Sequence, residues 1–117
     1  MTRILLVIED EPAIASLFRR RLGVHFEELH LVRTRSDAEA ILERVTVTHV
    51  VCDFHLGPQE PPASARIGEW RARWPAIRYT AMLSGSQLVP LSGIPGIDEV
   101  FLKPAGFESL VERLSQR

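Results

Sequence analysis

Carboxylate, hydroxyl and ammonium side chains follow four separate apolar runs of this sequence. They are Glu9 with Asp10, then Asp53, Ser84 and Lys103. If the runs are parallel strands of one sheet, their carboxyl ends gather at one edge, where the functional groups of such sheets meet. The sequence therefore predicts a single site that holds three carboxylates, one hydroxyl and one ammonium group.

The charge of this set indicates its chemistry. Two carboxylates about 4 Å apart repel by about 4 kcal/mol at the effective dielectric of a protein surface, so either their pKa values rise or a cation joins them. Carboxylate oxygens are ligands that Mg²⁺ prefers, and the ion would neutralise charge as phosphorus moves to a carboxylate nucleophile. Lys103 offers a point charge to the transferred group, and Ser84 offers a hydrogen bond.

Five apolar runs are typical of strands. Most are continuous rather than alternating, which favours strands buried on both faces of a parallel sheet. The runs are Ile4–Ile8, Leu29–Arg33, His49–Phe54, Tyr79–Leu83 and Val100–Leu102. Because helical segments separate them, right-handed crossovers are expected, and the predicted fold class is α/β, a doubly wound five-stranded parallel sheet with helices on both faces.

Residues at helical spacing lie between most of these runs. The expected helices cover Pro12–Leu22, a segment carrying Ala38 to Val45, Ser64–Trp74 and a segment from Phe107 to Leu114. Gly23 is a plausible stop for the first helix, and Ser36 with Glu39 forms a capping-box pattern before the second. Between Gly85 and Asp98, recurring proline and glycine leave room for at most a short helix.

Length and charge narrow the function classes. The 117 residues fit one domain, which we expect to span residues 1–117. A formal net charge of −1 argues against nucleic acid as the main partner, since phosphate backbones require a cationic surplus. The single cysteine, Cys52, and the lack of a signal peptide or a long apolar span predict a cytoplasmic protein with no membrane partner.

Other residues that bind ligands in some proteins are more typical of structural roles here. Trp70 and Trp74 are four residues apart on one expected helix, a spacing that favours packing rather than a binding platform. His49 has no ligand-like spacing to another histidine, so we expect it to be a structural or a surface residue.

The segments around the polar residues resemble a known family. Four signatures of response-regulator receiver domains, the phosphorelay switches of two-component signalling, are similar in order to Ile-Leu-Leu-Val-Ile-Glu-Asp-Glu-Pro, Val-Val-Cys-Asp-Phe-His-Leu, Met-Leu-Ser-Gly and Phe-Leu-Lys-Pro. The resemblance runs from Arg3 to the last helix. It implies a flavodoxin-like sheet of order 2-1-3-4-5, as in chemotaxis-regulator-like proteins.

The resemblance also implies a role for each polar residue. Asp53 would accept a phosphoryl group from a histidine kinase or phosphotransfer protein, Ser84 would turn toward that group as a switch, and Lys103 would pair with it. The implied Mg²⁺ ligands are Glu9, Asp10, Asp53 and the backbone carbonyl of His55. The phosphorylated domain would act on a downstream protein target or a fused output domain.

Two features depart from the family. Val100 stands where many receivers carry a switching tyrosine or phenylalanine, three residues before Lys103. Phe101 is one step away and should point to the opposite face of its strand. The stretch after Ser84 also leaves little room for the fourth helix, on the face that most receivers use for dimers or targets.

Two other functions stay open. A receiver-like interaction module that needs no phosphorylation is favoured by Val100 and opposed by the intact polar set. A Mg²⁺-dependent phosphohydrolase would need a second acid two residues after the nucleophile, where this chain has His55. The sequence does not separate a stand-alone protein from a piece of a longer chain.

Overall fold

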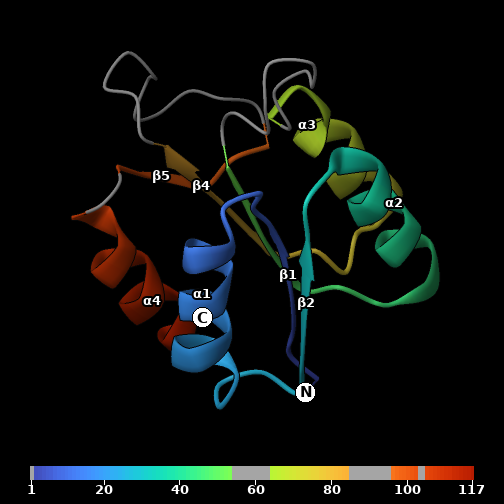
Figure 1. Ribbon diagram of the computed structural model, residues 1–117. Helices are drawn as coiled ribbons and strands as arrows, with labels where there is room; N and C mark the ends of the chain where they lie inside the picture. Colours follow the sequence, from blue (N-terminus) through green and yellow to red (C-terminus); the bar gives the residue numbers. More distant parts are fainter. Residues whose placement is uncertain (1, 54–63, 85–95, 103–104) are drawn as a thin grey trace.

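Figure 1 shows a computed structural model of the chain, in which residues 2–53, 64–84, 96–102 and 105–117 are described. For residues 53 and 64–66 the description covers the backbone alone. A central sheet lies between two layers of helices.

The sheet has five parallel strands in the order β2-β1-β3-β4-β5. The strands are β1 (Ile4–Ile8), β2 (Glu28–Val32), β3 (His49–Asp53), β4 (Tyr79–Ser84) and β5 (Glu99–Leu102). The predicted fold class and strand order are confirmed. Strand β2 lies one residue earlier than predicted, β4 ends one residue later and β5 begins one residue earlier. We call the edge where the strands begin the amino edge and the edge where they end the carboxyl edge.

Helices cover both faces of the sheet, as predicted (Figure 1). The helices are α1 (Pro12–Leu22), α2 (Arg35–Arg44), α3 (Ser64–Arg73) and α4 (Gly106–Gln116). Alternate residues of β1 separate two cores, because Leu5 packs with α1 and α4 whereas Leu6 packs with α2 and α3. Helix α1 starts at Pro12, whose missing amide hydrogen costs nothing in a first turn.

The predicted capping box of the second helix is wrong. Helix α2 begins two residues earlier, after Thr34, whose hydroxyl accepts a hydrogen bond from the backbone N–H of Asp37 at 3.1 Å. Thr34 has an extended backbone, the conformation of an N-cap residue, while Ser36 already lies inside the helix. The true cap therefore sits immediately after the end of β2.

Several smaller predictions can be compared with the structure. Trp70 is buried, as expected of a packing residue, and of the two roles left open for His49 the structure shows a buried one. Cys52 is buried as well. Val100 and Phe101 pack against different cores, which confirms that they point to opposite faces of β5. The short helix considered between Gly85 and Asp98 falls mostly on residues 85–95, outside the described part of the chain. None of the helices in that described part is long and apolar enough to cross a membrane.

Candidate functional site

Strands β1 and β3 deliver two of the predicted acids to the same place. Ile8 pairs with Cys52 in the parallel register, so Glu9 and Asp53 follow at the same level on adjacent strands. Neighbouring strands lie about 4.8 Å apart, which makes the backbones of these two residues neighbours. Asp10 follows one residue further along the chain.

Strands β4 and β5 extend this arrangement. Asp53 pairs with Leu83, so Ser84 lies one residue further along the neighbouring strand, where it pairs with Leu102. The structure thus brings the backbones of Glu9, Asp53 and Ser84 to the carboxyl edge. His55, Lys103 and the side chain of Asp53 lie outside the described residues, so their predicted positions in the site stay predictions.

The carboxylate of Glu9 lies at the amino-terminal end of α1. Glu9 is 3% exposed, and its Oε1 accepts a hydrogen bond from the backbone N–H of Glu11 at 3.1 Å. Glu11 is the N-cap residue of α1, so the buried charge lies where the helix dipole stabilises an anion. The backbone N–H of Glu9 donates to the carbonyl of Val32 at 2.9 Å, which ties the segment to β2. Asp10, the next residue, is half-buried.

Ser84 ends a strand that is buried along its whole length. All six residues of β4 are buried, and Ser84 itself is 0% exposed. A hydroxyl in such surroundings needs hydrogen-bond partners, because an unpaired polar group away from water is costly. Ser84 is therefore a candidate for a specific polar contact rather than a solvated surface serine.

The donor chemistry of the β1 acids fits a hard divalent cation. Glu9 and Asp10 offer carboxylate oxygens, the ligands that Mg²⁺ prefers. Among the side chains that the structure describes, no three histidine, cysteine, aspartate or glutamate groups are placed to hold a metal. The predicted ligands Asp53 and His55 are not among those side chains, so the full ligand set is a prediction.

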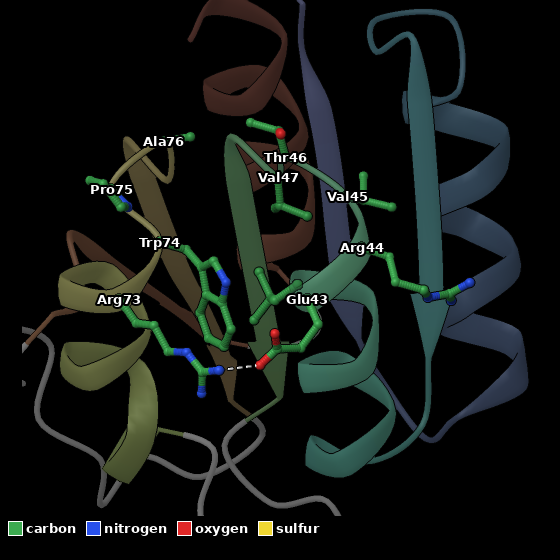
Figure 2. A pocket seen from close by; sticks show the side chains of 10 residues that line it. Glu43, Arg44, Val45, Thr46, Val47, Arg73, Trp74, Pro75 and Ala76 are labelled. Atoms are coloured by element: carbon green, nitrogen blue, oxygen red, sulfur yellow. Dashed lines mark hydrogen bonds and ion pairs between the residues drawn. The ribbon is translucent and has the colours of Figure 1, made fainter.

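A groove of about 330 Å³ lies at the opposite, amino edge of the sheet, between the carboxyl-terminal ends of α2 and α3 (Figure 2). Its lining residues are Leu42, Glu43, Arg44, Val45, Thr46, Val47, Arg73, Trp74, Pro75 and Ala76. An ion pair joins Arg73 to Glu43, and the Arg73 guanidinium lies 4.6 Å from the centre of the Trp74 ring (Figure 2). Trp74 packs against the core between the sheet and helices α2 and α3, as expected of a packing residue, and the groove contains none of the predicted site residues.

His49 at the amino edge has an unusual environment. It is 0% exposed, its Nδ1 lies 2.7 Å from the Thr48 hydroxyl, and its ring meets the Phe26 ring edge-on at 5.1 Å. Burial lowers the pKa of His49 from 6.5 to about 4; a backbone group of Arg117 acts against this, while the guanidinium of Arg78 adds to it. The imidazole is therefore neutral at neutral pH.

A second polar network at the amino edge was not predicted from the sequence. It joins Arg71 of α3, Thr80 of β4 and Asp98, the residue before β5. Asp98 lies at the end of a proline- and glycine-rich stretch with no periodic pattern, so nothing local singled it out. The only signal was its place two residues before an expected strand.

Comparison with known proteins supports the fold. No family model and no curated protein match this sequence. Solved receiver structures do match. The signal receiver domain of an HD domain-containing protein from Pseudomonas fluorescens Pf-5 has a TM-score of 0.82 at 19% identity, over 98% of this chain and 85% of that chain. The signal receiver domain of a DNA-binding response regulator from Colwellia psychrerythraea 34H has a TM-score of 0.80 at 21% identity, over 97% of this chain and 96% of that chain.

A third similar structure carries ligands. It is a response regulator protein from Burkholderia pseudomallei with a phosphorylated aspartic acid, a calcium ion and citrate, with a TM-score of 0.75 at 21% identity, over 96% of this chain and 66% of that chain. At these identities the likeness shows the fold alone. This chain has the fold of CheY-like response-regulator receiver domains, and the resemblance expected from its motifs is confirmed at that level.

Proposed function

We propose that this chain is a response-regulator receiver domain that accepts a phosphoryl group on Asp53. The observation that carries the proposal is the convergence of β1, β3 and β4 at the carboxyl edge, with Glu9, Asp53 and Ser84 at their ends. A fold by itself hosts many functions. The combination of this fold with acids and a buried hydroxyl at one edge favours phosphoryl transfer to a carboxylate.

The proposed reaction moves phosphorus from a histidine kinase or phosphotransfer protein to this chain. A carboxylate oxygen of Asp53 attacks the phosphorus, the bond from phosphorus to the histidine nitrogen breaks, and an aspartyl phosphate forms. The Lys103 ammonium pairs with the transferred group, and the Ser84 hydroxyl donates a hydrogen bond to it. The chain would turn over no other substrate.

Glu9, Asp10, Asp53 and the backbone carbonyl of His55 would hold Mg²⁺. When bound, the ion would neutralise the acids and the charge of the incoming phosphoryl group. The calcium ion and phosphorylated aspartic acid of the Burkholderia protein support a divalent cation beside such an aspartate. The carboxyl group of Glu9 lies at the start of α1, where the helix dipole would favour its role as an anionic ligand.

The output is a change in partner binding. Phosphorylation would shift a population between two conformations with different affinities for a downstream protein or a fused output domain. Val100 packs with Met82 and Ile97 in the core beneath α2 and α3, so the change would be transmitted without an aromatic side chain at that position. We place this signalling in the cytoplasm.

Incubation of the folded protein with acetyl phosphate and Mg²⁺, followed by intact-mass measurement, tests the proposal. We expect the mass of one phosphoryl group to be gained, and the gain to be absent in Asp53→Asn and in the presence of a chelator. Glu112→Gln, which neutralises an exposed acid on α4, is the matched control and should be labelled like the wild type.

Failure to label would leave the second function, an interaction module that works without phosphorylation. Val100 in place of the usual aromatic residue is the observation that favours it. Steady turnover of a phosphomonoester that is lost in Asp53→Asn would instead indicate a phosphohydrolase.

A further inference from the structure

We infer that Asp98 is a positioning residue that fixes the register of β5 and thereby the point at which the chain continues to Lys103. This inference rests on the proposed function. Strand β5 needs such a device, because it is an edge strand of four residues, all of them only half-buried. Val100 and Phe101 present apolar side chains to both cores, so the apolar pattern of β5 distinguishes one register from the next only weakly.

The Asp98 carboxylate binds β4 and α3 together. Its Oδ2 accepts hydrogen bonds from the backbone N–H of Thr80 and from Nη1 of Arg71, both at 2.8 Å. The backbone N–H of Asp98 donates to the carbonyl of Thr80 at 3.0 Å. Thr80 is 1% exposed, so the bond to its backbone is partly shielded from water, whereas the ion pair with Arg71 is exposed. Residue 98 is thus held opposite residue 80 by main chain and side chain at once.

Gly96 fixes the position of the turn before β5 relative to α3. Its carbonyl accepts hydrogen bonds from the Thr80 hydroxyl and from Nη1 of Arg71, the latter at 3.3 Å. Its φ is +82°, and a Cβ atom there would lie 2.7 Å from the backbone nitrogen of Gly68. Only glycine fits this contact without strain. The turn before β5 therefore has one position relative to α3.

Glu99 secures the other face of the strand. Its Oε1 accepts a hydrogen bond from the Tyr79 hydroxyl at 2.7 Å and lies 3.2 Å from Nε of Arg113 on α4. Asp98 and Glu99 together thus hold the start of β5 on both faces of the sheet. Of these two carboxylates, that of Asp98 is the one bonded to the backbone of β4, and we therefore assign the register to Asp98.

The register decides where Lys103 begins. In the observed pairing Leu102 lies opposite Ser84, and Lys103 is the next residue. A slip of one residue would move the chain by about 3.3 Å and turn every side chain of β5 to the opposite face. The ammonium group would then leave the phosphoryl group that Ser84 contacts. The Mg²⁺ ligands on β1 and β3 would be unaffected, because they do not belong to β5.

This difference provides the test. Affinities for Mg²⁺ alone, and for beryllium fluoride as a phosphoryl mimic in saturating Mg²⁺, are measured by titration calorimetry on wild type and Asp98→Asn. We expect the variant to bind beryllium fluoride roughly tenfold more weakly, because a hydrogen-bonded charge is lost. Its Mg²⁺ affinity should stay within about twofold of wild type, a change too small to reflect a lost ligand.

Two further variants distinguish a positioning role of Asp98 from a general loss of structure. In the Lys103→Ala background, the added substitution Asp98→Asn should not weaken the binding of beryllium fluoride any further, because the group that Asp98 positions is already absent. Glu43→Gln removes a different charged partner of α3, the one that binds Arg73 (Figure 2), and should change neither affinity. If Asp98→Asn fails to fold, Arg71→Gln is measured in the same way, with a smaller loss expected.

Three results would overturn the inference: equal beryllium fluoride affinity in wild type and Asp98→Asn, a parallel loss of Mg²⁺ affinity, or the same loss in the Lys103→Ala background. A wild-type protein that binds no beryllium fluoride would instead contradict the proposed function. The two failures are therefore distinguishable.

Discussion

At the amino edge of the sheet, polar side chains form hydrogen bonds with each other and with the main chain. At the carboxyl edge, by contrast, several acidic residues of like charge follow or end the strands. Thr48 accepts from the backbone N–H of Ile4 at 2.9 Å, and Asp98 bonds Thr80 and Arg71. Arg3 donates to the carbonyls of His25 and Leu114 at 2.6 and 2.5 Å. These bonds join segments far apart in sequence, so the amino edge fixes the strands relative to the helices.

The carboxyl edge has the opposite character. Glu9 and Asp10 follow β1, and Asp53 ends the adjacent strand β3. Carboxylates that gather closely cost stability that a bound cation would return. Functional sites commonly break the local rules that the rest of a fold obeys. Under the proposed function, the amino edge supplies stability and the carboxyl edge supplies chemistry, and four predictions test this division.

The largest effect should come from His49 at the amino edge. Its pKa falls from 6.5 to about 4 on folding. Between these pH values the imidazole is therefore protonated in the unfolded chain but neutral in the folded protein. The contribution of the neutral His49 to the free energy of unfolding is fully present above pH 6.5 and is lost as the pH falls toward 4. The linked loss of unfolding free energy is about 3 kcal/mol. Denaturant unfolding across this pH range measures it.

His49→Gln should remove this pH dependence, while His25→Gln, at an exposed position, should keep it. An unchanged pH profile in His49→Gln would contradict the division, because the buried imidazole would then carry none of the acid sensitivity.

Two glycines in contact should respond in opposite directions. Gly96→Ala forces a side chain into a left-handed backbone and against Gly68, and should cost about 2 kcal/mol of unfolding free energy. Gly68→Ala, in an exposed position of α3 with nothing within 4 Å of the new atom, should gain about 0.5–1 kcal/mol. Thermal unfolding of both variants checks the pair, and equal effects would argue against a tightly fitted turn before β5.

Neutralising an acid at the carboxyl edge should stabilise the fold. Asp53→Asn without metal should raise the unfolding free energy by about 1 kcal/mol, since repulsion by Glu9 and Asp10 is relieved. Added Mg²⁺ should stabilise the wild type but not this variant. Glu112→Gln is the control, and stabilisation of the same size there would show that the carboxyl edge holds no special repulsion.

The smallest effect should come from the surface pair between α1 and α4. Arg21 and Glu108 form two hydrogen bonds, at 2.6 and 2.8 Å, which lower the pKa of Glu108 and raise the pKa of Arg21. Both side chains are well exposed, so water and salt screen the attraction. Arg21→Gln should lower the melting temperature only slightly at low salt and not at all at high salt.

Much of the carboxyl edge could be predicted because it depends on local sequence patterns. Continuous apolar runs gave β1, β3 and β4 nearly to the residue, and polar residues directly after them marked the candidate site. Parallel pairing then requires their ends to meet. Helical spacing similarly located α1 and α4, whose apolar residues face the sheet.

The tertiary structure alone decided which cap starts α2, how deeply His49 is buried and how Asp98 holds β5. Thr34 and Ser36 offer the same local chemistry, and the end of β2 selects between them. Asp98 meets Thr80 and Arg71 across 18 and 27 residues of sequence. Local periodicity reports which face of an element is apolar, but hydrogen bonds between distant segments depend on how the helices pack on the sheet.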